Sequence, residues 1–273
     1  MNGARSVGLL VRASHPGPTV AVTTLAVLLA VAGRIAPGGV AAVGVAVLAG
    51  QLSIGWSNDL LDLARDRRVN RRDKPIATGE LPVNVVQVAL VITLLVSAAA
   101  SAVLGPAAGA VHLLLVVGSG WAYNVGLKRT AASFVPYAMA FGSLPAVVQL
   151  AGPAAGLPPA WLLTAGALLG VGVHLVNALP DLADDASTGV TGLPQRLGER
   201  RSRRLATVLL LAGTVAAVLG PAPPRPAWVW AAVVAVGVLA VVIMVARGAV
   251  PFRAALGVAL IDAVVLVGRS VAA

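Results

Sequence analysis

Long apolar runs of about 20 residues dominate the chain, and short polar or proline-rich stretches separate them. A helix of about 20 apolar residues crosses the roughly 30 Å hydrocarbon core of a bilayer, because each residue adds about 1.5 Å along the helix axis. The pattern therefore predicts nine transmembrane helices. Their expected ranges are 18–36, 39–57, 83–104, 107–125, 132–151, 160–179, 205–220, 227–246 and 250–271.

Composition supports a membrane protein. The mean hydropathy is +0.92, and 11% of the residues are charged, whereas soluble domains average about 25%. We therefore expect one all-α integral membrane domain over residues 1–273. Arg5 and Arg12 precede the first run, but no clear cleavage site follows it, so the run is expected to remain as an uncleaved helix. The absence of cysteine excludes disulfides and thiolate metal sites.

The basic residues are arranged as membrane topology requires. Seventeen of the 20 Lys and Arg residues lie in the N-terminal tail and in the loops after the even-numbered runs; the other three are Arg34, Arg225 and Arg269. This bias predicts a protein of the cell membrane whose N-terminus and even-numbered loops are cytoplasmic. Because the +10 net charge is spread over alternate loops and forms no single stripe, we expect no nucleic-acid partner.

Carboxylates concentrate in two of these loops, which topology does not require. Eight of the ten acidic residues fall in 59–80 and 181–185. The stretches NDLLDLARD (58–66) and NALPDLADD (177–185) are identical at six of nine positions. The repetition indicates two related halves that face a shared site.

Helical spacing would place the repeated polar residues on one face of each segment, because residues four apart are neighbours. These residues are Asn58, Asp62 and Asp66 in the first copy, with Asp59 beside them, and Asn177, Asp181 and Asp185 in the second. Like charges at this spacing repel, so they need a cation. Salt bridges from Arg65 and Arg68 are one possibility, but they give no reason for the pattern to occur twice. Oxygen-only ligands favour Mg²⁺, which binds one or two carboxylates together with substrate phosphates.

These residues resemble the motifs of the UbiA superfamily of intramembrane prenyltransferases. The first family motif, NDxxDxxxD, is complete at 58–66, and the second, DxxxD, is preceded by Asn177 and followed by Gly189. KPIATG (74–79) is similar to a following RPI or RPL element, with Lys74 in place of the usual Arg. A third element, formed by Tyr123, Leu127, Lys128, Arg129 and Thr130, resembles the family pattern YxxxLKRxT, although Thr130 here follows Arg129 directly.

The resemblance covers the whole chain and implies a bundle of about nine transmembrane helices, with two Asp-rich cytoplasmic loops and pseudo-repeated halves. It also implies Mg²⁺-dependent transfer of a prenyl group from a prenyl diphosphate to a small aromatic or hydroxylated acceptor, with the tail in a tunnel open to membrane lipid. The implied metal ligands are Asp59, Asp62, Asp66, Asp181 and Asp185. The implied catalytic residues are Asp62, Asp66, Asp181 and Asp185. The implied diphosphate-binding residues are Asn58, Arg72, Lys74, Tyr123, Lys128 and Asn177.

Two other functions remain open. A terpene cyclase on the same scaffold would use the same diphosphate ionisation without an acceptor, although a chain with ten aromatic residues offers few aromatic faces to steer a cation. A transporter would also show repeated halves, but its charges should lie within the membrane. Gln51, His112, His174 and Asp262 are weaker candidates, each equally explained by packing or pairing between helices.

Overall fold

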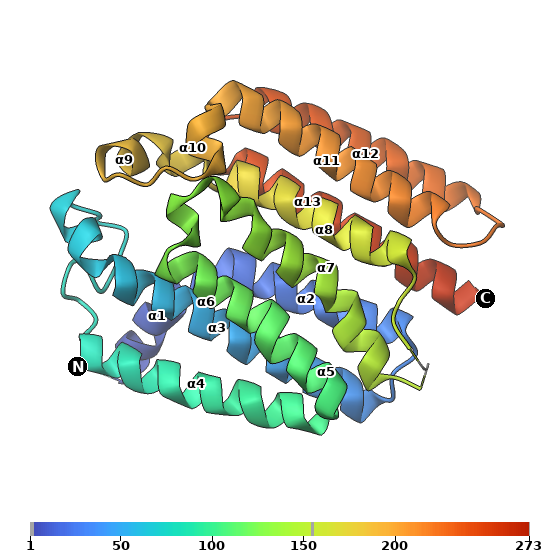
Figure 1. Cartoon of the computed structure of the whole chain (residues 1–273), viewed down its shortest axis with the longest axis horizontal. Coiled ribbons are helices and arrows are strands. Elements are labelled where there is room, and N and C mark those ends of the chain that lie inside the picture. The colour runs from blue at the N-terminus through green and yellow to red at the C-terminus, as the bar shows by residue number, and fades with distance from the viewer. Residues whose placement is uncertain (1–2, 154–155, 273) are drawn as a thin grey trace.

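In a computed structural model that describes residues 3–153 and 156–272, the apolar runs form helices that lie side by side in a bundle (Figure 1). No strand occurs among these residues, which confirms the all-α prediction. The longer helices are α1 (Gly3–Ala13), α2 (Pro16–Ala32), α3 (Pro37–Arg68), α4 (Val83–Val103), α7 (Val135–Ala151), α8 (Ala160–Asn177), α11 (Glu199–Leu219), α12 (Ala227–Val245) and α13 (Val250–Ala272). The shorter ones are α5 (Pro106–Val111), the π-helical turn η1 (His112–Val117), α6 (Gly118–Val125), the 3-10 turns η2 (Leu127–Arg129), η3 (Ala131–Phe134) and η4 (Leu179–Asp181), α9 (Leu182–Ser187) and α10 (Leu193–Leu197).

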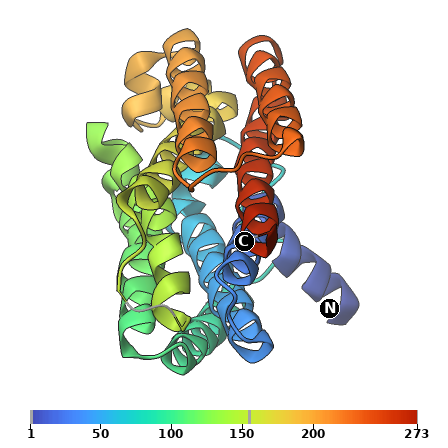
Figure 2. The ribbon, with the colours of Figure 1, turned by 90° about the vertical axis from the view of Figure 1, so that its right-hand side faces the viewer.

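Eight helical segments of the described chain are long and apolar enough to cross a membrane. The pair α1 and α2 would supply a ninth, but a bend of 73° separates its two members. Figure 2 shows α1 projecting from the side of the bundle. The prediction of about nine spans is thus confirmed for eight segments of the described chain, and for a ninth if α1 and α2 count as one bent span.

Two helices extend beyond the apolar runs that predicted them. The run 39–57 becomes α3, which continues to Arg68 through the whole first Asp motif, and the run 205–220 becomes α11, which begins at Glu199. Hydropathy marks only the part of a helix that lies in lipid, so it ends the first of these predictions too early and begins the second too late. The expectation that the first Asp motif lies in a loop is wrong, because the motif forms the last turns of α3.

Small residues allow the helices to pack closely. A side chain at Gly170 of α8 would come within 2.5 Å of the Tyr137 carbonyl oxygen of α7, and one at Gly172 would meet Leu210 of α11. Helix α8 accordingly packs between α7 and α11, while α3 packs between α2 and α4. Close approach of small residues is the usual means of association between membrane helices.

The two Asp motifs lie at the same end of the bundle. The C-terminal end of α3 and the short helices α9 and α10 all lie toward the left in Figure 1. The turn η2, which carries Lys128, joins this end through an ion pair with Asp62 of α3. The fold therefore brings together three segments that are far apart in the sequence.

Candidate active site

A cavity of about 370 Å³ lies between the helices that carry the two motifs. One part of its wall is polar and includes Asn58, Asp62, Arg65, Arg71, Asp73, Lys74, Lys128, Asn177, Asp181 and Asp185. Another part is apolar and includes Val22, Val116, Phe141, Leu144, Val173, Phe252 and Leu256. Gln51 also lines the cavity, about 10 Å along the α3 axis from Asn58, given seven residues at about 1.5 Å each. The cavity therefore suits a ligand with a charged end and an apolar tail.

Asp62 is the most heavily paired carboxylate on the cavity wall. The ammonium of Lys128 lies 2.6 Å from each of its oxygens, and Arg65 Nη2 lies 3.0 Å from Oδ2. Lys128 also donates to Asn58 Oδ1 at 3.3 Å, so it contacts two residues of the first motif. Burial lowers the pKa of Lys128, and the negative charge of Asp62 opposes this change.

Arg65 connects the two motifs. Its guanidinium contacts Asp66 Oδ1 at 3.3 Å on its own helix and Asp185 Oδ1 at 3.5 Å on the second motif. Asp66 is buried, whereas the Asp185 side chain is 13% exposed. Burial raises the pKa of Asp185, while a hydrogen bond from Gln195 at 2.7 Å and the charge of Arg65 act in the opposite direction.

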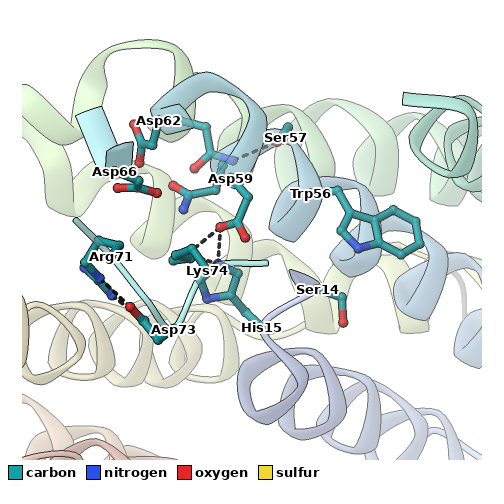
Figure 3. A network of polar contacts seen from close by, with 12 residues as sticks. Ser14, His15, Trp56, Ser57, Asp59, Asp62, Asp66, Arg71, Asp73 and Lys74 are labelled. Atoms are coloured by element: carbon teal, nitrogen blue, oxygen red, sulfur yellow. Dashed lines mark hydrogen bonds and ion pairs between the residues drawn. The ribbon is translucent and has the colours of Figure 1, made fainter. Parts of the chain in front are cut away.

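Arg71 makes a second connection between the motifs. It forms a two-pronged ion pair with Asp73, at 2.9 Å on each side, and its Nη1 lies 3.0 Å from Asp181 Oδ1. Figure 3 shows Arg71 turned toward Asp73 in the loop that follows α3. Arg71 lowers the pKa of Asp73 to about 2. Such a fork-to-carboxylate geometry is among the strongest side-chain contacts in proteins.

Asp59 makes contacts of a different kind. Its Oδ1 forms an ion pair with the Lys74 ammonium and lies 2.9 Å from His15 Nε2. His15 and Lys74 line the cavity, and Lys74 Nζ lies 2.9 Å from His15 Nε2 (Figure 3). His15 lies where α1 ends and α2 begins, in the left-handed region at φ 54°. Asp59 therefore contacts two groups on the cavity wall while its own carboxylate is almost completely buried.

The third sequence element lies beside the first motif. Asn124 donates to the Ile54 carbonyl and to Ser57 Oγ, each at 2.8 Å, and these bonds hold the end of α6 against α3. Tyr123 lines the cavity and makes an edge contact with Tyr137, with ring centroids 5.3 Å apart. The predicted positions of Tyr123 and Lys128 at the site thus agree with the structure.

The second motif does not form one helix. Helix α8 ends at Asn177, and η4 and α9 follow it as separate turns. Pro180 has no N–H to donate to the Val176 carbonyl, so the helix cannot continue unbroken. The expectation that Asn177, Asp181 and Asp185 share one helical face is therefore wrong, although all three line the cavity.

The sequence of the chain matches the pattern of the UbiA prenyltransferase family over residues 19–255. The chain belongs to this family. This membership and the apolar helices identify the protein as an integral membrane protein.

One curated relative of this UbiA-family protein is the bacteriochlorophyll synthase 33 kDa chain of Cereibacter sphaeroides. The two are 34% identical over 178 residues, which cover 61% of this chain and 58% of the relative. The match thus spans well under two thirds of the relative's length.

Solved structures show the same fold. A UbiA homologue from Aeropyrum pernix aligns with a TM-score of 0.74 at 16% identity, covering 93% of this chain and 96% of that one. A UbiA homologue from Archaeoglobus fulgidus, bound to GPP and Mg²⁺, aligns with a TM-score of 0.73 at 14% identity, covering 97% and 98%. At these identities the likeness establishes the fold.

The carboxylates of this UbiA-family protein have the chemistry of a magnesium site, since all their donor atoms are oxygens and sit beside cationic groups. Among the described residues, no three carboxylate or imidazole side chains converge closely enough to hold a metal ion by themselves. This arrangement fits an ion that takes one or two protein carboxylates and completes its coordination with phosphate oxygens and water.

Several predicted residues lie elsewhere. Arg72 is exposed, and the neighbouring Arg71 takes its expected place on the cavity wall. Asp262 is buried between helices and accepts a hydrogen bond from Thr214 at 2.9 Å. His174 is buried against Ser133, at 3.0 Å from its Oγ, and makes ring contacts with both tyrosines.

Sequence reasoning missed three polar residues that contact the motifs: His15, Arg71 and Gln195. Arg65 was recognised only as a possible salt-bridge partner. Its position three residues after Asp62 and one before Asp66 is a usable signal for its role, because residues three apart are neighbours on a helix. His15 lies in a helix break, Arg71 in a loop and Gln195 in the short helix α10, and the tertiary contacts that bring them to the motifs leave no periodic signal in the sequence.

Proposed function

We propose that the protein transfers a prenyl group from a prenyl diphosphate to a small acceptor with an aromatic ring or a hydroxyl group, and releases diphosphate. One observation carries this proposal: a single cavity has the carboxylates of both motifs and several cationic side chains on one part of its wall and apolar side chains on another. The diphosphate would lie at the polar part and the isoprenoid tail against the apolar part. The family membership and the relative named as a bacteriochlorophyll synthase chain support this assignment.

The cationic side chains would bind the diphosphate oxygens directly. Lys74, Lys128 and Arg71 each line the cavity and are each held by a carboxylate, so their positions are set before substrate arrives. Donors that are fixed in a poorly solvated site stabilise developing negative charge more effectively than mobile ones. Asn58, Asn177 and Tyr123 would add neutral hydrogen bonds to the same group.

Asp62, Asp66, Asp181 and Asp185 are the carboxylates that would hold Mg²⁺, in sets of one or two per ion. Bound magnesium would neutralise the charge that develops on the leaving diphosphate. In the structure Arg65 and Arg71 provide the compensating positive charge between the two motifs. Both side chains are therefore placed to turn toward phosphate oxygens when the carboxylates take a metal ion.

The apolar wall would exclude water from the reactive allylic carbon. Water in the site would capture the prenyl cation in place of the acceptor. Phe141 and Leu144 of α7 and Leu256 of α13 contribute to this wall, so helices from the middle and the C-terminal end of the chain would enclose the tail.

The excess of basic residues in alternate loops supports a location in the cell membrane with the site at the cytoplasmic face. Soluble prenyl diphosphates and magnesium would then reach the polar part of the cavity from the cytoplasm, while the tail remains among lipid-embedded helices.

The deciding experiment measures diphosphate release and product mass with purified protein, Mg²⁺, prenyl diphosphates of several lengths and a panel of acceptors. We expect Asp62→Asn and Asp181→Asn each to lower turnover by about 100-fold or more, as loss of a preorganised electrostatic group commonly does. Glu80→Gln is the matched control, since this exposed carboxylate in the same loop as Lys74 contacts only Thr78.

A product whose mass equals acceptor plus prenyl group would establish the transfer. Release of a hydrocarbon or terpene alcohol without acceptor would instead establish a cyclase. Full turnover in both Asp variants would contradict the assigned role of the carboxylates.

A further inference from the structure

Asp59 belongs to the first motif by sequence, but its surroundings differ from those of Asp62. Asp62 lines the cavity and pairs with Lys128 and Arg65. The Asp59 side chain is 1% exposed, and its Oδ1 is occupied by Lys74 and His15. Its Oδ2 is buried and has no hydrogen-bond partner among the described residues. Asp59 is not among the residues that line the cavity, whereas Asp62 is, so an ion bound in the cavity would not reach the buried Oδ2 of Asp59.

Lys74 needs a fixed position in order to act on a diphosphate. A lysine ammonium is a compact charge at the end of a flexible four-carbon chain, with three N–H groups and no fixed direction. Without a specific partner it could pair with any of the carboxylates nearby. Asp59 supplies that partner through its ion pair with Lys74. His15 lines the cavity with a side chain that is 39% exposed, and its Nε2 lies 2.9 Å from the same ammonium (Figure 3).

The position of His15 is itself determined by close packing at the break between α1 and α2. Gly55 of α3 lies so near the break that an added Cβ would come within 2.5 Å of the Ser14 carbonyl oxygen. Trp56 donates to the Leu10 carbonyl at 3.0 Å, which holds the end of α1 on the same helix. The chain is thus held directly before the point from which His15 projects.

Helix α1 also holds the loop that carries Lys74. Arg12 Nη2 donates to the carbonyl of Asp73 at 3.2 Å and to that of Arg72 at 3.4 Å. Helix α1 therefore contacts the backbone of the two residues before Lys74, while His15, in the break after α1, contacts the Lys74 ammonium.

We propose that Asp59 and His15 are positioning residues that hold the Lys74 ammonium toward the substrate diphosphate, and that Asp59 does not ligate the metal. The break between α1 and α2 is then a structural part of the diphosphate site. This inference rests on the proposed function and refines the role of one residue of the first motif.

The test separates metal binding from diphosphate binding. An unreactive prenyl thiolodiphosphate is titrated into purified protein by calorimetry at a series of Mg²⁺ concentrations. We expect Asp59→Asn to weaken analogue binding by about 10- to 100-fold, the usual cost of losing a hydrogen bond to a charged group, and to leave the Mg²⁺ midpoint unchanged. Asp62→Asn, the comparison variant, should raise the Mg²⁺ midpoint.

Two His15 variants test the imidazole independently, because His15 is partly exposed and we expect its replacement to leave the fold intact. We expect His15→Ala to raise the KM for prenyl diphosphate by about tenfold with little change in kcat. His15→Gln should restore most of this loss, because its amide can still contact both Asp59 and Lys74. A purely structural role would give the same result for both variants.

The outcomes are distinct. A rise in the Mg²⁺ midpoint for Asp59→Asn equal to that for Asp62→Asn would make Asp59 a metal ligand and overturn the proposal. A wild-type KM for His15→Ala would remove His15 from it. Failure of the unmodified protein to bind the analogue at any Mg²⁺ concentration would contradict the proposed function itself.

Discussion

Arg65 is the residue on which the two Asp motifs converge. It contacts Asp62 and Asp66 on its own helix and Asp185 on the second motif. Pairing between buried charges seldom adds net stability, because removing the ions from water costs about as much as their attraction returns. Removal of one partner is nevertheless costly, since it leaves a buried charge without compensation. In this arrangement Arg65 neutralises the carboxylates, and a metal ion could replace it in that role.

This role of Arg65 predicts a stability loss that magnesium reverses. Without metal, Arg65→Ala should lower the free energy of unfolding by on the order of 3 kcal/mol, because Asp66 loses its ion-pair partner inside the protein. Mg²⁺ with inorganic diphosphate should restore much of this loss. Thermal unfolding in detergent, with EDTA or with magnesium and diphosphate, measures both effects.

Arg68 provides the control, because it lies three residues further on the same helix and is exposed. Arg68→Ala should change stability by less than about 0.5 kcal/mol under either condition. Equal stability of the two variants in EDTA would show that the carboxylates do not depend on Arg65.

At the scale of single elements, α3 both spans the membrane and carries the first Asp motif, although hydropathy marks only its membrane part. Its first part is an apolar membrane helix, and its last turns carry the first Asp motif and the bridging arginine. Within this helix Gly55 sets the distance to the break between α1 and α2. A side chain at this position would collide with backbone atoms, which cannot rotate away as a side chain could.

Gly55→Ala should therefore move the break and with it His15. Because Lys74 would lose a positioning contact, we expect the KM for prenyl diphosphate to rise by about tenfold. Gly38→Ala is the matched control, because it places the same substitution on α3 where nothing lies within 4 Å of the added Cβ. Steady-state kinetics of both variants measure the effect, and an unchanged KM for Gly55→Ala would contradict the link between packing and substrate binding.

The same elements show how much could be predicted from sequence. The length of the apolar runs predicted the membrane helices, and the spacing of Asn58, Asp62 and Asp66 correctly placed the first motif on a helical face. The second motif broke this rule because Pro180 interrupts it, a signal that was present in NALPDLADD. His15 and Arg71 lie in a helix break and a loop, where tertiary contacts decide the direction of the side chain and no periodicity exists to indicate it.

At the scale of the whole molecule, the charged site and the apolar surface that would face lipid occupy different parts of one bundle. The carboxylates and cations gather where α3, η2 and α9 meet, while most of the remaining bundle is apolar enough to lie in lipid. The positive charge of the alternate loops would hold this polar end in the cytoplasm. Under the proposed function, basic residues would determine the topology, and four of them, Arg65, Arg71, Lys74 and Lys128, would also belong to the site.

This arrangement predicts which end of the bundle faces the cytoplasm. The chain contains no cysteine, so a single introduced thiol reports its own side of the membrane without background. Arg67→Cys lies near the first Asp motif, and Leu157→Cys lies in the exposed connection before α8. A membrane-impermeant maleimide should label Arg67→Cys in inside-out vesicles only and Leu157→Cys in right-side-out cells only, because helices that span the bilayer keep the two ends on opposite sides. The reverse pattern would place the carboxylates outside the cell, away from cytoplasmic prenyl diphosphates, and would contradict the proposed orientation.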